Sequence, residues 1–292
     1  MIMFGAPQAK HSATKKGKRV QMPNGAAQFV GSIPDNYDRG LGPHVFVDYA
    51  ADLARRVAST SPSRVVELAA GTGIVTCALR DALPASVHLL ATDLNPPMLE
   101  VARKKFNVGE NIAFQPADAT ALPFEDVAFD AIACQFGVMF FPDKDKSYRE
   151  AYRVLSPGGR YLFNVWDAFE YNPFARIAHE TIGRFLPADV PGFYRVPFGY
   201  HQIDPIKASL LATGFDEVSA SVVRFQKIIP RAVEFAKGLV FGNPVIEQIR
   251  DHGTADPNGV VAAVTTALQE TFGADPGLMP LQAIVFSARK PQ

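Results

Sequence analysis

The stretch Arg64–Thr76 reads R-V-V-E-L-A-A-G-T-G-I-V-T and decides the fold of this 292-residue chain. It runs from an apolar, β-like segment through Glu67 to Gly71 and Gly73, and then into an apolar, helix-like segment. Two glycines after a strand allow a tight turn and let a ligand approach the backbone, and the start of the next helix offers free amide groups. The stretch therefore predicts a strand, a ligand-binding turn and a helix.

Short apolar runs alternate with helical patterns from residue 64 to residue 166. This alternation is typical of a parallel sheet with helices on its faces. Asn95 precedes Pro96 and Pro97, and we expect its side chain to cap the helix that follows. The expected strands are residues 64–70, 87–92, 111–116, 129–136 and 159–166, and the expected helices are residues 73–81, 96–106 and 145–155.

The residues around the two glycines distinguish between two classes of ligand. A dinucleotide-binding turn needs the pattern G-x-G-x-x-G, so that a pyrophosphate meets backbone amides and the helix dipole. Here Thr76 stands in place of the third glycine, and Ala69 stands two residues before Gly71. A carboxylate at Glu67 is unfavourable beside a diphosphate but suits a ligand with an ammonium group and a sulfonium. The turn thus favours S-adenosylmethionine over a dinucleotide.

The run Glu67–Gly73 resembles the first motif of class I S-adenosylmethionine-dependent methyltransferases, and the resemblance continues over roughly residues 37–166. Asp93, 20 residues after Gly73, matches the acidic residue that ends the family's second strand. Further matches are Asp118-Ala119 after the third strand, Phe129–Phe136 as the fourth strand, and Arg153–Gly159 as the turn before the fifth. Within the family, the run Phe136–Asp143 is similar to small-molecule methyltransferases of ubiquinone and menaquinone biosynthesis.

The resemblance also implies the architecture. Two more strands are expected at residues 218–229 and 281–289. With them, the implied fold is α/β and Rossmann-like, a doubly wound, seven-stranded, mostly parallel sheet with an antiparallel last strand and a partly helical cap insertion. We divide the chain into a flexible basic leader (residues 1–30), an S-adenosylmethionine-binding core with an N-terminal helix (31–166), a cap insertion (167–204) and the remainder of the sheet (205–292), with a helical insertion near 231–272.

Each matched position has an implied role in cofactor binding. Asp93 takes the ribose hydroxyls, since charge-assisted hydrogen bonds of this kind contribute about 1.5 to 3 kcal/mol each. The Asp118 side chain and the Ala119 backbone amide supply the acceptor and the donor that adenine needs. Glu67 holds the glycine turn and approaches the methionine ammonium group. The other expected cofactor-binding residues are Tyr37, Ala69, Gly71, Gly73, Leu94, Met98 and Gln135.

Structural roles are the alternative at several of these positions. Asp93 and Asp118 also suit turn caps, and Glu67 also suits a loop brace. Packing alone accounts for Tyr37 equally well, and Gln135 is an ordinary residue for the end of a strand.

Composition narrows the partners. Lys plus Arg equals Asp plus Glu at 29 each, so the formal net charge is zero, which argues against a surface built for nucleic acid or an anionic membrane. No apolar run reaches the length of about 18 residues that a membrane span requires, and we expect a cytoplasmic protein with a small-molecule substrate. Cys77 and Cys134 lack metal-ligand spacing, so no metal site is expected.

The expected activity is methyl transfer by in-line displacement, from S-adenosylmethionine to a small, apolar or aromatic acceptor, leaving S-adenosylhomocysteine. Such a site needs alignment and dryness more than a dedicated base. His201 and Tyr200 are candidate proton acceptors, and Tyr194, His179 and Asp167 are conceivable helpers. Two alternatives stay open: a non-catalytic cofactor-binding or scaffold protein, and a NAD(P)-dependent oxidoreductase. The residues identify neither the acceptor atom nor the oligomeric state.

Overall fold

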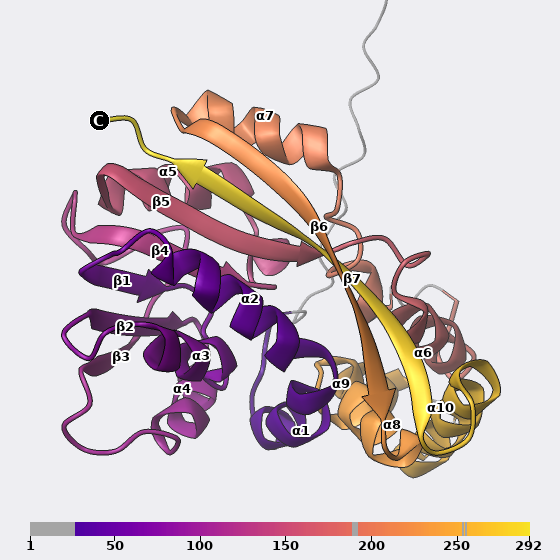
Figure 1. The fold of residues 1–292 in the computed structure, drawn as a ribbon. Helices are drawn as coiled ribbons and strands as arrows, with labels where there is room; N and C mark the ends of the chain where they lie inside the picture. Colours follow the sequence, from indigo (N-terminus) through magenta and orange to yellow (C-terminus); the bar gives the residue numbers. More distant parts are fainter. Residues whose placement is uncertain (1–26, 189–191, 253, 255) are drawn as a thin grey trace, which may run out of the picture.

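Seven strands form one sheet in the computed structural model, which describes residues 27–188, 192–252, 254 and 256–292 (Figure 1). The order across the sheet is β3-β2-β1-β4-β5-β7-β6, and only β7 runs antiparallel to its neighbours. This confirms the expected mostly parallel sheet with an antiparallel last strand. The strands are β1 (Arg64–Glu67), β2 (His88–Asp93), β3 (Ile112–Pro116), β4 (Phe129–Gln135), β5 (Leu155–Trp166), β6 (Asp216–Ile229) and β7 (Gly277–Arg289). Residues 1–26 of the expected leader lie outside the described residues.

Helices cover both faces of the sheet, as a doubly wound fold requires. On one face α2 (Val47–Ala58) and α3 (Ile74–Ala82) bury Leu53, Val57 and Leu79 against Val65 and Leu89 of the strands. The other face carries α4 (Pro96–Arg103), α5 (Lys144–Val154) and α7 (Ile203–Thr213). Because neighbouring residues of a strand point to opposite faces, Val65 and Val66 belong to different apolar clusters.

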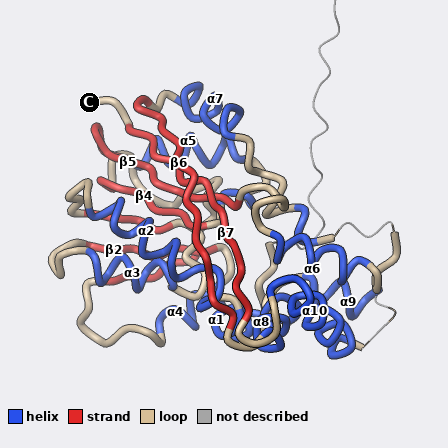
Figure 2. The backbone as a smooth tube through the Cα atoms, turned by 45° about the vertical axis from the view of Figure 1, so that its right-hand side comes forward, coloured by secondary structure: helices blue, strands red, loops and turns tan. Residues whose placement is uncertain are grey.

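Five further helical segments gather at the far end of the long β6–β7 ribbon (Figure 2). They are α6 (Pro173–Gly183), η3 (Phe193–Arg195), α8 (Ala232–Phe241), α9 (Val245–His252) and α10 (Pro257–Phe272). The N-terminal helix α1 (Ile33–Gly40) and the π-helical turn η1 (Gly42–Phe46) lie between this group and the sheet. We call the group the helical cap. It combines segments from before β6 and from between β6 and β7.

Two glycines bring α1 and α8 into backbone contact. A Cβ atom added to Gly40 would lie 2.5 Å from the Cα atom of Gly238, and one added to Gly238 would lie 2.5 Å from the carbonyl carbon of Gly40. One turn further along, a Cβ atom on Gly242 would lie 3.0 Å from the backbone of Tyr37. The seam between the core and the helical cap therefore has no room for a methyl group.

One local prediction is wrong. The Asn95 side chain does not cap α4. Instead its amide nitrogen donates to the backbone of Ala27 and to Asp93, and its oxygen accepts a hydrogen bond from the amide of Phe29. The polar group is engaged by a segment distant in sequence, which a local pattern does not reveal.

Candidate functional site

A cavity of about 430 Å³ lies outside the carboxyl ends of β1, β2 and β4. This edge is where open parallel sheets bind their ligands, and the volume falls in the usual range of small-molecule sites. Its lining brings together most of the residues that the sequence singled out. These are Tyr37, Ala69, Gly71, Asp93, Leu94, Met98, Asp118, Ala119 and Gln135.

The glycine turn has the backbone that its sequence predicts. Gly71 and Gly73 have φ angles of 56° and 80°, and Ala69 also adopts a positive φ of 52°. A Cβ atom on Gly73 would lie 2.8 Å from the Cβ of Ala102 in α4, so a larger residue there would push two helices apart. Phe136, which follows β4 on the adjacent side of the crevice, has a φ of 51°. Backbone strain of this kind concentrates at functional sites.

Asp93 is buried at the end of β2 and braces the turn. Its Oδ2 accepts a hydrogen bond of 2.9 Å from the amide of Gly71, and its Oδ1 accepts from the backbone and side chain of Asn95. Burial raises the pKa of Asp93, and the hydrogen bonds from Asn95 and Gly71 oppose that rise. The Asp93 carboxylate thus lines the cavity and also fixes the glycine turn at Gly71.

Glu67 lies below the turn, beside a small recess lined by Tyr37, Gly71 and Thr72. It accepts a hydrogen bond of 2.6 Å from the Thr76 hydroxyl, and burial raises its pKa to about 8. Thr76, which replaces the third glycine of a dinucleotide turn, is therefore its partner. In the described part of the chain, the buried Thr72 hydroxyl has no hydrogen-bond partner. A carboxyl group and an unpaired hydroxyl suit a ligand that ends in an ammonium and a carboxylate.

Asp118 and Ala119 form the opposite end of the cavity. The Oδ1 atom of Asp118 accepts hydrogen bonds of 2.8 Å from the amide and the hydroxyl of Thr120. The side chain is exposed, whereas Ala119 is buried. Because only Oδ1 is used in the turn, the other oxygen of Asp118 is available to a ligand. The two roles expected for Asp118, turn cap and ligand contact, are therefore compatible.

Tyr37 and Gln135 line the cavity next to the turn. The Tyr37 ring stacks on Phe46 at 4.9 Å, and burial together with Asp93 raises its pKa. The Gln135 side chain donates to the backbone carbonyl of Phe46 and accepts from Asn164. Gln135 therefore ties η1 to the sheet as well as lining the cavity.

Sequence reasoning missed the segment Ala27–Phe29, which lines the cavity beside Asn95. Neither a motif nor an apolar periodicity marks it. Its residues fall in the leader expected at residues 1–30, and only the hydrogen bonds to Asn95 in the folded chain identify it as part of the site.

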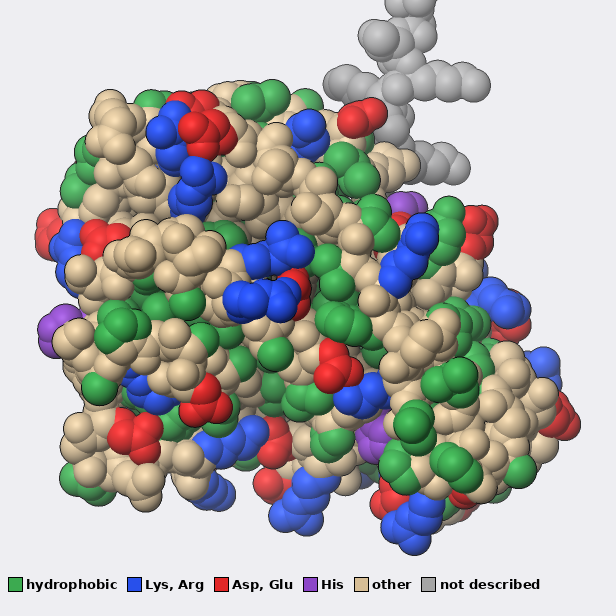
Figure 3. Space-filling model, viewed as in Figure 1, with side chains coloured by type: hydrophobic (Ala, Val, Ile, Leu, Met, Phe, Trp, Pro, Cys, Tyr) green, Lys and Arg blue, Asp and Glu red, His purple; other side chains and the backbone are tan. Residues whose placement is uncertain are grey.

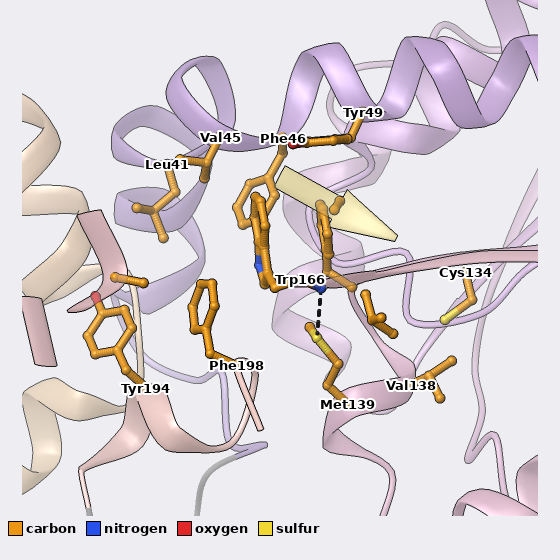
Figure 4. Packing of buried hydrophobic residues seen from close by; sticks show 14 of the residues in the cluster. Leu41, Val45, Phe46, Tyr49, Cys134, Val138, Met139, Trp166, Tyr194 and Phe198 are labelled. Carbon is orange, nitrogen blue, oxygen red and sulfur yellow. Dashed lines mark hydrogen bonds between the residues drawn. The ribbon is translucent and has the colours of Figure 1, made fainter. Parts of the chain in front are cut away.

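A second, apolar pocket of about 60 Å³ adjoins the cavity and shares four aromatic residues with it. The shared residues are Phe29, Tyr37, Phe136 and Phe140. Trp166 stacks on Phe136 at 3.9 Å and on Phe198 at 5.6 Å. Figure 4 shows part of this pocket, with the Trp166 amide donating to the Met139 sulfur at 3.4 Å. The far wall comes from the helical cap, through Tyr194, Leu239 and Asn243.

The expected proton acceptors lie elsewhere. Tyr200 shares a hydrogen bond of 2.8 Å with Tyr148, and burial raises its pKa to about 12. His201 contacts the carbonyl of Phe198, and Asp167 accepts from Gln282. Neither the cavity nor the apolar pocket is lined by any of the three, or by His179.

Tyr194 is the one candidate for proton transfer that does line the apolar pocket. Its hydroxyl donates to the carbonyl of Leu239 at 2.7 Å, and burial raises its pKa. A phenol in this state holds its proton and is a poor base.

Within the described ranges, neither a metal-ligand cluster nor a membrane-spanning helix is found. Acidic and basic side chains are interspersed over the face drawn in Figure 3. Among the described residues, no three metal-ligating side chains gather in one place. None of the helices in the described ranges combines the length and the apolar character needed to cross a bilayer.

Known proteins share this arrangement. Residues 41–182 match the model of the ubiE/COQ5 methyltransferase family. Demethylmenaquinone methyltransferase of Thermus thermophilus is 35% identical over 57% of this chain and 79% of the relative. Ubiquinone/menaquinone biosynthesis C-methyltransferase UbiE of Pectobacterium carotovorum is 34% identical over 53% of this chain and 67% of the relative.

Solved structures show the same fold at lower identity. The YcgJ protein of Bacillus subtilis has a TM-score of 0.54 at 22% identity and covers 84% of this chain and 99% of its own. Phosphoethanolamine N-methyltransferase 2 of Haemonchus contortus, solved with S-adenosyl-L-methionine, has a TM-score of 0.58 at 16% identity, over 94% of this chain and 61% of its own.

The fold and the matches define an S-adenosylmethionine-dependent methyltransferase. More narrowly, the chain belongs to the ubiE/COQ5 methyltransferase family. Its methyl donor is S-adenosyl-L-methionine. The two alternatives, a scaffold protein and a NAD(P)-dependent oxidoreductase, find no support.

Proposed function

We propose that this enzyme methylates a flat, mostly apolar ring that enters the aromatic pocket beside the cofactor cavity. The observation that carries the proposal is the wall of four aromatic residues that the two spaces share. Because Tyr37 and Phe136 line both spaces, an acceptor in the pocket and a methyl donor in the cavity meet directly beside these two rings. In-line displacement requires this adjacency, and alignment alone contributes roughly 7 to 11 kcal/mol in well-oriented reactions.

The cofactor orientation that we propose follows the chemistry of the lining. Asp118 and Ala119 hold adenine, and Asp93 accepts the ribose hydroxyls while it keeps its bond to Gly71. The methionine end lies over the turn, where Glu67 faces the ammonium and the Thr72 hydroxyl gains a carboxylate partner. Met98 and Leu94 pack against the nucleoside.

The bound cofactor supplies an electrophilic methyl group, and the protein supplies dryness and position. No Asp, Glu, Lys, Arg or His is among the described residues that line the apolar pocket. Its two ionisable groups, Tyr37 and Tyr194, both have raised pKa values and stay protonated. The acceptor therefore brings its own nucleophile, which favours electron-rich phenols, enols and quinols over amines that enter as cations.

The relatives agree with this class of acceptor, because their names place them in menaquinone and ubiquinone biosynthesis. The pocket holds only about 60 Å³, less than most ligand sites, so its aromatic side chains must shift when a ring enters. The segments of the helical cap that build the far wall lie largely outside the family match. The fine specificity of this enzyme is thus expected to differ from that of its relatives.

A transfer assay tests the proposal. Labelled S-adenosylmethionine is incubated with the full chain and, separately, with quinols, phenols, amines and keto acids. We expect label on the quinols or phenols, and far less of it with Asp93→Ala, the control in which cofactor binding is expected to be much weaker. Label on amines or keto acids alone, or on none of these compounds, contradicts the proposed acceptor class.

A further inference from the structure

Asn243 is a buried amide in the otherwise apolar wall of the second pocket. It lies between α8 and α9, is only 6% exposed, and belongs to the helical cap. A buried polar group is costly unless it is hydrogen-bonded. The partners of its two polar atoms therefore show what the group does.

The amide nitrogen of Asn243 is fully engaged within the protein. It donates to the carbonyl of Leu239 at 3.2 Å and to the hydroxyl oxygen of Tyr194 at 3.3 Å. The Tyr194 hydroxyl gives its own proton to the same Leu239 carbonyl, at 2.7 Å. Because that carbonyl only accepts, the side of the amide that faces it must be the nitrogen, and the orientation of Asn243 is fixed.

The amide oxygen is left over. Among the residues that the structure describes, none donates a hydrogen bond to Oδ1 of Asn243. The oxygen is not completely buried either, unlike the unpartnered hydroxyl oxygens of Thr72 and Tyr161. It thus keeps contact with open space in a residue that lines the pocket. Such an oxygen is an acceptor that awaits a donor.

We propose that Asn243 positions the methyl acceptor, its Oδ1 accepting a hydrogen bond from an O–H or N–H group on the ring that enters the pocket. This inference rests on the proposed function and narrows it to rings that carry a donor on the side away from the cofactor. Phe136 and Tyr37 line both the cavity and the pocket, whereas Asn243 lines the pocket alone. A ring held by Asn243 is thereby fixed in the pocket while its edge near Phe136 and Tyr37 meets the methyl donor.

Trp166 gives a direct readout, because it is the single tryptophan of the chain and lines this pocket. The protein is saturated with S-adenosylhomocysteine and titrated with phenol and with toluene, which match in shape but differ in the donor. Wild type is compared with Asn243→Leu and with Asn258→Leu, an exposed asparagine of α10 that serves as the matched control. Binding of S-adenosylhomocysteine to each variant reports that it is folded.

We expect the preference for phenol over toluene to fall about five- to tenfold in Asn243→Leu and to stay at the wild-type value in Asn258→Leu. An equal preference in wild type and Asn243→Leu overturns the role of Asn243 but leaves the pocket standing. Emission that responds to neither compound in wild type refutes the proposed acceptor pocket itself.

A second measurement needs no variant, should Asn243→Leu fail to bind S-adenosylhomocysteine. A crystal structure of the wild-type protein with S-adenosylhomocysteine and phenol is expected to place the phenol oxygen within hydrogen-bond distance of Oδ1 of Asn243. A phenol oxygen that points toward Tyr37 instead contradicts the proposal.

Discussion

The cofactor cavity and the apolar pocket touch each other but are built on different principles. The cavity is formed mainly by strand ends and turns between residues 69 and 142, joined by Tyr37 and the segment Ala27–Phe29, and its polar groups are held by hydrogen bonds around the glycine turn. The pocket is formed by rings from Phe29 to Phe198 and by Asn243, brought together by packing. A motif can encode the first kind of site, whereas the second exists only in the folded chain.

The largest expected effect is a loss of affinity at the cofactor cavity. Asp93→Ala removes the carboxylate and the brace on Gly71, and we expect S-adenosylhomocysteine to bind at least about 100-fold more weakly, from two lost charge-assisted hydrogen bonds. Isothermal titration calorimetry measures it. Asp81→Ala, at an exposed acid of α3, is the control and should bind as wild type does. Unchanged affinity in Asp93→Ala would exclude the ribose contact.

The next effect concerns pH at Glu67. Its pKa is raised in the folded state, so the protonated form favours folding; that stability is complete below the ordinary value of 4.5 and is lost as the pH rises to about 8. Relative to Glu67→Gln, wild type should lose about 1.4 kcal/mol of unfolding free energy per pH unit across this window. Urea unfolding at about pH 6 and pH 8 tests this. Parallel pH dependence in the two proteins would refute the shift.

Cofactor affinity should change with pH in the opposite direction. An ammonium group beside Glu67 stabilises the ionised carboxylate, so binding of S-adenosylhomocysteine strengthens as the pH rises toward about 8. In Glu67→Gln that dependence should disappear. Calorimetry in buffers of different ionisation enthalpy would detect the proton that wild type releases on binding. If no proton is released, Glu67 does not contact the ammonium group.

A smaller effect is expected at the seam between the core and the helical cap. Gly238→Ala places a methyl group 2.5 Å from the Gly40 backbone, and we expect a loss of about 1 to 2 kcal/mol of stability despite the helix preference of alanine. Gly259→Ala, in α10 with open space around it, is the matched control and should be neutral or stabilising. Thermal unfolding compares the two. Equal midpoints would show that the seam adapts.

The smallest expected effect lies at the adenine end. Asp118 is exposed, and one of its oxygens already accepts a hydrogen bond from Thr120. Asp118→Ala should therefore weaken the binding of S-adenosylhomocysteine only about three- to tenfold. Glu125→Ala, an exposed acid in the loop before β4, provides the comparison. A loss of affinity as large as that of Asp93→Ala would mean that Asp118 fixes the turn at Thr120 in addition to contacting adenine.

The same contrast explains what the sequence could predict. Alternating runs and the glycine turn were enough for the sheet, because local sequence determines where strands and turns form. Strand β1 stops at Glu67 instead of residue 70, because Ala69 adopts a left-handed backbone. The bond between Asn95 and the segment at Ala27 joins residues 68 apart, and Trp166 meets Phe198 across a 32-residue separation. Contacts of that range leave no trace in a periodic pattern.

The Gly40–Gly238 seam also limits how the acceptor specificity of this enzyme can be changed. Because α1 carries Tyr37 at the cavity and lies directly on the backbone of α8, the helical cap and the N-terminal helix must fit each other closely. A chimera that takes its cap from a relative would have to take residues 33–46 as well. We therefore expect that the acceptor specificity of this enzyme is changed by exchanging two segments together, residues 33–46 and the helical cap.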